Sequence, residues 1–193
     1  MRAPSTLPGR LLSRLSEAAI AVARTLGEER GAWISGLASA DFLVAEDGSF
    51  HLLEINARPG ASLEAAEAVL GTSLIGLHVE ACRGLLPVLG EPRGHAVTTI
   101  IYAPSDLCMP MLEDWPTWAG DRTQLGEPVR AGAPLATVLA TAADAEGAST
   151  LGARRKAELM ERLTVVARPS GRDRVRFPPR AALRGRLDDH ALD

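Results

Sequence analysis

Residues 36–62 read GLASADFLVAEDGSFHLLEINARPGAS, and this stretch decides the fold. Two apolar runs, 40–45 and 50–56, flank the pair Asp47-Gly48. An Asp-Gly pair between two such runs is a strong signal for a tight turn between antiparallel strands. The stretch therefore predicts a β-hairpin.

The predicted hairpin places two acidic side chains opposite each other. With a two-residue turn, Glu46 pairs with Ser49, and the pairing then brings Asp41 opposite Glu54. Directly opposed like charges destabilise a sheet, and apolar neighbours on both faces make charge that is not neutralised costly. The pattern therefore indicates that something neutralises this pair.

Two residues beyond Glu54 stands Asn56, whose amide falls on the same face because side chains alternate along a strand. Two carboxylates and an amide oxygen form a hard, oxygen-only ligand set. Such a set suits Mg²⁺ or Mn²⁺ held together with substrate phosphates. Arg58 follows the strand and could contact a phosphate oxygen through paired hydrogen bonds.

A reading without a metal is also open on the residues alone. The acidic end of an amphipathic hairpin at the solvent boundary carries Asp and Glu as well, and two carboxylates can share one proton. Arg58, taken singly, fits a surface arginine. The spacing of these residues does not decide between the two readings.

The composition limits the class of protein. The chain has 193 residues, 46% of them apolar, which is enough for one mid-sized domain or two small ones. Its formal net charge of -3 gives no overall attraction to nucleic acid or to an anionic membrane. Cys82 and Cys108 are too few for a disulfide framework or a zinc site. We expect a cytoplasmic protein that binds neither nucleic acid nor membrane.

Periodicity and turn residues predict the remaining elements. In chain order these are helices 11–26, 62–70 and 74–82, a strand at 96–103, two short strands within 128–140, and a helix at 153–163. Ser62 is expected to cap the second helix and Gly71 to end it. Residues 168–193 are rich in Arg, Pro and Gly and are predicted to be disordered. The expected division is a lobe at 1–87, a small β-rich part at 94–163 and a tail at 164–193.

Residues 36–44 and 52–62 resemble the last strands of the ATP-grasp domain. In that superfamily, an acid on one strand and a Glu-x-Asn on the next bind the magnesium ions that bridge the phosphates of ATP. The resemblance implies three metal ligands, Asp41, Glu54 and Asn56, and three contacts to the Mg²⁺–ATP (or Mn²⁺–ATP) cofactor, Glu54, Asn56 and Arg58. It also implies a catalytic role for Arg58, which would steady the transferred phosphoryl group.

The resemblance extends to predicted carboligases related to biotin carboxylase, through residues 74–84, 115–122 and 132–138. It implies an α+β chain that holds the C-terminal part of an ATP-grasp fold, an antiparallel sheet with flanking helices, and a small β-rich C-terminal appendage. The implied activity is ligation of an unknown small carboxylate to an amine or a thiol through an acyl phosphate.

One part of the family pattern is missing from the sequence. The first ATP-grasp lobe supplies lysines and a glycine-rich loop, whereas Lys156, the only lysine here, lies in a predicted charged surface helix. The expectation is therefore a truncated chain, or one whose missing lobe is carried by a separate chain. The alternative is a non-catalytic ATP-grasp remnant or interaction module.

Overall fold

The computed structural model describes residues 1–31 and 33–166. Contacts divide the chain into two compact units that interleave along the sequence. The first unit contains Met1–Thr99 and Leu139–Ala153, and the second contains Ile100–Val138 and the described residues 154–166. The linear boundaries expected from the sequence, 1–87, 94–163 and 164–193, therefore differ from the division by contacts and remain a prediction.

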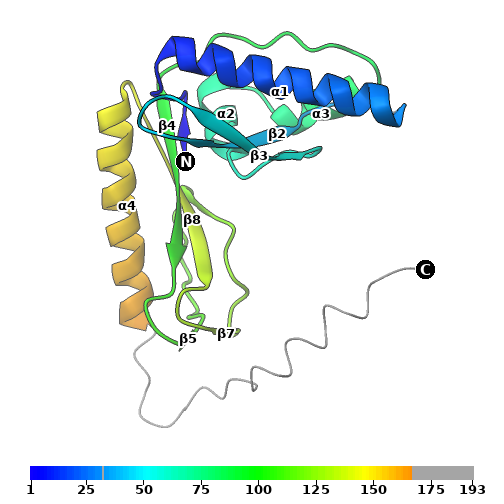
Figure 1. The fold of residues 1–193 in the computed structure, drawn as a ribbon. Coiled ribbons are helices and arrows are strands. Elements are labelled where there is room, and N and C mark those ends of the chain that lie inside the picture. The colour runs from blue at the N-terminus through cyan, green and yellow to red at the C-terminus, as the bar shows by residue number, and fades with distance from the viewer. Residues whose placement is uncertain (32, 167–193) are drawn as a thin grey trace, which may run out of the picture. The chain divides into compact units, whose positions relative to one another are not determined.

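Helices and antiparallel strands alternate irregularly along the chain (Figure 1), which confirms the predicted α+β class. The elements are β1 (Arg2–Ala3), α1 (Gly9–Arg30), β2 (Ser39–Val44), β3 (Phe50–Asn56), α2 (Leu63–Leu70), α3 (Leu74–Cys82), β4 (His95–Tyr102), β5 (Leu107–Cys108), β6 (Ala119–Gly120), β7 (Pro128–Val129), β8 (Pro134–Ala142) and α4 (Ala145–Val166). The strands form three sheets, ordered β1-β4-β8-β6, β2-β3 and β5-β7. No helix in the described ranges is long and apolar enough to cross a membrane.

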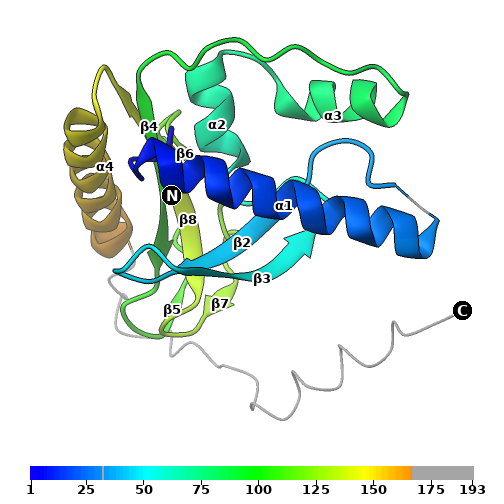
Figure 2. The same ribbon diagram turned by 45° about the horizontal axis from the view of Figure 1, so that its top comes forward.

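In the first unit, α1 runs along the hairpin of β2 and β3 (Figure 2). Its apolar side chains recur every three to four residues, so one stripe of the helix faces the sheet, with Leu15 buried at 9% exposure. Arg14 reaches the tip of the hairpin, where its Nη1 donates to the carbonyl of Gly48 at 3.2 Å and its guanidinium lies over the ring of Phe50. The predicted helix at 11–26 is confirmed and is longer at both ends.

Helix α2 packs in the first unit through small side chains. Ala65 and Val69 of α2 and Ala96 of β4 are buried together, and such small residues let helix and strand approach closely. Gly71 ends α2 in a left-handed conformation with φ 64°, as predicted. Ser62 occupies the capping position but its side chain accepts no hydrogen bond there, so the predicted side-chain cap is wrong.

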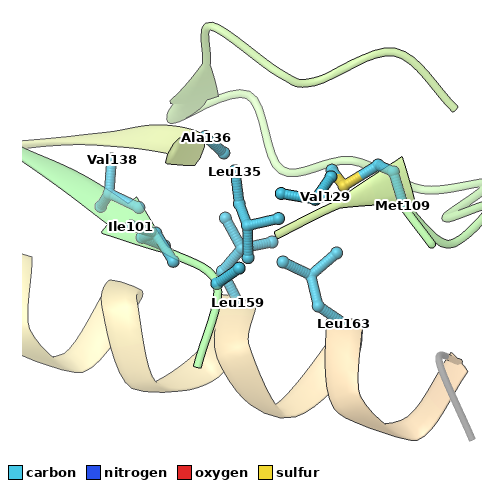
Figure 3. Packing of buried hydrophobic residues seen from close by; sticks show 9 residues of the cluster. Ile101, Met109, Val129, Leu135, Ala136, Val138, Leu159 and Leu163 are labelled. Atoms are coloured by element: carbon cyan, nitrogen blue, oxygen red, sulfur yellow. The ribbon is translucent and has the colours of Figure 1, made fainter. Parts of the chain in front are cut away.

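The second unit has an apolar core of its own (Figure 3). Leu159 and Leu163 lie one turn apart on α4 and point toward the strands, where they pack with Leu135 of β8 and Val129 of β7. The predicted strand at 96–103 and the pair of strands within 128–140 are confirmed as β4, β7 and β8. The sequence did not predict β1, β5 or β6, each of which has two residues.

Helix α4 begins eight residues before the predicted start at 153, at Ala145. Its first turn is capped by Asp144, whose Oδ1 accepts the backbone N–H of Gly147 at 2.7 Å. Gly147 and Gly152 lower the helix propensity of this part of the chain, so periodicity alone placed the start too late. The helix continues to Val166, and the predicted disorder of 168–193 lies outside the described residues.

Candidate functional site

The turn of the hairpin differs from the prediction by one residue. The N–H of Ala45 donates to the carbonyl of Ser49 at 2.9 Å, so three residues form the loop and the predicted pairing of Glu46 with Ser49 is wrong. Gly48 has φ 77°, which suits the left-handed position of a three-residue hairpin loop. Hydrogen bonds from the hydroxyl and the amide of Ser49 to Asp47 fix the loop and lower the pKa of that carboxyl.

A β-bulge restores the predicted pairing further along the strands. Phe42 pairs with Leu52, but Asp41 pairs with Glu54, so Leu53 is an extra residue on β3. The bulge shifts the register by one residue, which cancels the shift made by the longer turn. The opposition of Asp41 and Glu54 is therefore confirmed, although neither the turn nor a regular ladder produces it.

The two faces of the hairpin differ in exposure. Along β2, Asp41 and Leu43 are exposed whereas Phe42 and Val44 are partly buried, and Glu54 on β3 is exposed as well. The face that carries the acids is open, so water screens both carboxylates. The expectation that apolar surroundings make this charge costly is therefore wrong. The geometry opposes two like charges, but exposure removes the requirement that a cation neutralise them.

The arrangement of Asn56 fits a metal site. Its Nδ2 donates to Oε1 of Glu54 at 2.8 Å, which confirms that the two side chains share a face. The NH₂ group is used in this bond, and no hydrogen bond within the described residues engages Oδ1 of Asn56, an acceptor of the kind that binds Mg²⁺. Within the described part of the chain, neither Asp41 nor Glu54 takes part in an ion pair. The available oxygens therefore match the donor set that a hard divalent cation prefers.

Arg58 lies in the loop after β3, with its side chain exposed. Its Nη1 donates to the carbonyl of Pro59 at 3.3 Å, and no hydrogen bond in the described chain joins it to Asp41, Glu54 or Asn56. Residues 1–31 and 33–166 contain no group of three or more His, Cys, Asp or Glu side chains that could hold a metal. The roles assigned to these four residues therefore stay predictions, and a metal here would need further oxygens from a ligand or water.

Two apolar side chains beside the acids were not recognised from the sequence. Leu43 follows Asp41 by two residues and is 60% exposed, and Leu53 precedes Glu54 and is 64% exposed. Strand alternation in the sequence places Leu43 on the same face as Asp41, but it does not say whether that face is covered. The open face therefore combines the carboxylate of Asp41 with the apolar side chain of Leu43.

Solved structures with a similar fold include biotin carboxylases and related carboxylases. A biotin carboxylase of Campylobacter jejuni, described as a β,γ-ATP complex, has a TM-score of 0.57 and 19% identity, over 78% of this chain and 36% of that one. The urea carboxylase of Kluyveromyces lactis has a TM-score of 0.59 and 20% identity, over 78% of this chain and 14% of that one. The biotin carboxylase domain of a Hydrogenobacter thermophilus 2-oxoglutarate carboxylase, in complex with MgADP and bicarbonate, has a TM-score of 0.57 and 16% identity, over 81% and 37%.

These likenesses concern the fold. No family model and no curated protein sequence matches the chain. The chain spans between 14% and 37% of the length of these three structures. The structural likeness therefore confirms the expectation of a partial ATP-grasp fold, of the kind found in biotin carboxylases.

Proposed function

We propose that this chain is the Mg²⁺–ATP-binding portion of an ATP-grasp ligase, which joins a small carboxylate to an amine or a thiol. The observation that carries the proposal is the open face of the hairpin, where Asp41 opposes Glu54 and Asn56 is hydrogen-bonded to Glu54. The likeness to carboxylases with bound nucleotide supports the same proposal.

In this proposal, Asp41, Glu54 and Asn56 hold Mg²⁺ or Mn²⁺. When bound, the ion neutralises the charge of the nucleotide phosphates. Glu54 fixes the amide of Asn56 so that its oxygen is available, and Arg58 steadies the phosphoryl group that is transferred. Leu43, exposed on the same face as Asp41, provides an apolar surface next to these ligands.

The proposed reaction has two steps. A carboxylate oxygen of the substrate attacks the γ-phosphorus of ATP, which forms an acyl phosphate and releases ADP. An amine or a thiol then attacks the acyl carbon and releases inorganic phosphate. Both steps need positioning and charge neutralisation rather than a nucleophile from the protein.

The other half of the nucleotide clamp belongs to the proposal as well. The lysines and the glycine-rich loop of the first lobe would come from further polypeptide or from a separate chain. In calorimetry, this chain alone is then expected to bind ATP weakly or undetectably, because it offers the nucleotide one surface only. Sub-micromolar affinity would contradict this expectation.

A non-catalytic remnant or interaction module is the alternative. It is favoured by the exposure of Asp41 and Glu54, which can coexist in water without a metal, and by the absence of a described contact between Arg58 and the acids. A remnant would keep the fold of the hairpin without affinity for a metal–nucleotide complex.

Paramagnetic broadening separates the two functions and detects weak binding. Substoichiometric Mn²⁺ with excess ATP is added to the ¹⁵N-labelled chain, and the amide signals are followed. The ligase portion predicts that signals of Asp41, Glu54 and Asn56 broaden first, and that Asp41→Asn and Glu54→Gln each reduce the effect. Broadening that is absent at these residues, or unchanged in both variants, favours the remnant.

A further inference from the structure

Helix α3 holds the segment that leads into β2. Nδ1 of His78, on α3, accepts the backbone N–H of Leu37 at 2.9 Å, although the two residues are far apart in the sequence. Because an amide N–H can only donate, Nδ1 must be unprotonated, and the neutral ring carries its proton on Nε2. The hydrogen bond therefore fixes both the orientation and the tautomer of His78.

Gly36 lets the His78 ring approach this closely. Its φ of 89° is in the left-handed region, and a Cβ built on it would lie 2.7 Å from Cε1 of His78 and 2.9 Å from Sγ of Cys82. Sγ of Cys82 in turn lies 3.6 Å from the carbonyl of Ser35. The three consecutive residues Ser35 to Leu37 thus contact the side chains of His78 and Cys82, which lie one turn apart on α3.

The held segment determines where Asp41 lies. Residues 33–38 have no regular secondary structure, and β2 begins two residues after Leu37. Asp41 follows Leu37 by four residues, in a strand whose ladder is interrupted by a bulge directly beyond Asp41. A bulge weakens the constraint that the ladder places on register, so the anchor at Leu37 gains importance at this end of β2.

We propose that His78 is a positioning residue for the metal–nucleotide site. By accepting the N–H of Leu37, it holds the start of β2 so that the carboxylate of Asp41 stays opposite Glu54. This inference rests on the proposed function, since it concerns the geometry of that site. His78 itself touches neither acid and is not a ligand.

Three substitutions at His78 distinguish the loss of the hydrogen-bond acceptor from a change in side-chain volume. Asn presents its Oδ1 near the position of Nδ1 and keeps the acceptor, whereas Gln places its amide near Nε2 and Ala has no polar group. In the full chain, hydrogen exchange of the Leu37 amide is measured by NMR for each variant. His78→Ala and His78→Gln are expected to raise the exchange rate about five- to tenfold, the effect of one lost hydrogen bond, and His78→Asn to stay near the parent.

Broadening by Mn²⁺–ATP at Asp41 and Glu54 is measured on the same samples. The proposal predicts at least a threefold loss of the Mn²⁺ effect at Asp41 in His78→Ala, with recovery in His78→Asn. Unchanged exchange of Leu37 in His78→Ala overturns the proposal. Faster exchange together with an unchanged Mn²⁺ effect overturns the positioning role and leaves the proposed function intact. No Mn²⁺ effect in the parent chain refutes the proposed function, and this inference with it.

Discussion

Replacing Glu54 with Gln should stabilise the metal-free chain and weaken its binding of metal at the same time. Gln keeps an oxygen that can accept Nδ2 of Asn56, so the hydrogen bond now formed at 2.8 Å survives. The substitution removes one of the two negative charges that Asp41 and Glu54 bring into register. A charged side chain that binds a ligand can destabilise the ligand-free protein, so its removal is expected to raise stability and to weaken binding.

The stability gain follows from the exposure of the pair. Opposed side chains in an antiparallel sheet have Cβ atoms about 5 Å apart. Two unit charges separated by about 6 Å in water repel by about 0.7 kcal/mol, and physiological salt reduces this by roughly half. For a chain of this size, 1 kcal/mol corresponds to about 2–4 °C, so the midpoint of thermal unfolding should rise by about 1.5–3 °C at low salt.

The loss in binding should be larger than the gain in stability. If Gln weakens the binding of Mn²⁺–ATP tenfold, the stabilisation that the ligand gives falls by up to about 1.4 kcal/mol when ligand is in excess. In Mn²⁺–ATP at about ten times the dissociation constant of the parent or more, the parent chain should then unfold at a higher temperature than Glu54→Gln. The order of the two midpoints thus reverses between chelator and metal.

Glu46→Gln is the matched control, since Glu46 lies in the turn of the same hairpin and has no acid opposite it. Thermal unfolding is followed by circular dichroism in EDTA at about 10 mM and about 500 mM salt, because screening should remove only the effect at Glu54. The reasoning is refuted if Glu54→Gln lowers the midpoint in EDTA, or if Mn²⁺–ATP stabilises Glu54→Gln as much as the parent.

Three further substitutions test the geometry described above. Gly36→Ala should lower the free energy of unfolding in urea by at least about 1 kcal/mol more than Gly84→Ala; the two glycines have similar φ, 89° and 85°, but only at Gly36 would the new Cβ meet His78. Equal losses would show that backbone strain alone matters. Leu159→Ala removes a side chain that is 0% exposed and should cost about 3 kcal/mol in the same assay, whereas a cost under about 1 kcal/mol would contradict the packing of the second unit. The carboxyl pKa of Asp47 lies below its ordinary value of 3.8 in the folded chain, so its contribution to stability is present above that pH and is lost as the pH falls. The difference in unfolding midpoint between the parent and Asp47→Asn should therefore shrink from pH 6 to about pH 3, and a difference that grows on acidification would contradict this.

Local sequence signals predicted the elements around the site well. The hairpin strands, α2 and α3 follow from short-range patterns, namely apolar runs beside an Asp-Gly turn and helices ended by Gly71 and Gly84. The start of α4 was missed because Gly147 and Gly152 lower helix propensity, while the cap at Asp144 depends on a side-chain geometry that propensity does not register.

Non-local features of the site could not be predicted in the same way. The hydrogen bond from Leu37 to His78 joins residues that are brought together only when α3 packs against the chain before β2. The exposure of Leu43 and Leu53 depends on what covers a face, whereas strand alternation tells only that two faces exist. Both features depend on tertiary packing, which the pattern of residues along one strand does not contain.

The opposition of Asp41 and Glu54 was predicted for a reason that the structure replaces. A two-residue turn was assumed, but a three-residue turn and a bulge at Leu53 shift the register by one residue each and in opposite senses. The expectation that burial forces a cation onto the pair also fails, since both side chains are exposed. The argument for a metal therefore moves from electrostatic necessity to geometry: two acids held opposite each other by compensating irregularities, and an amide that Glu54 orients with its oxygen free.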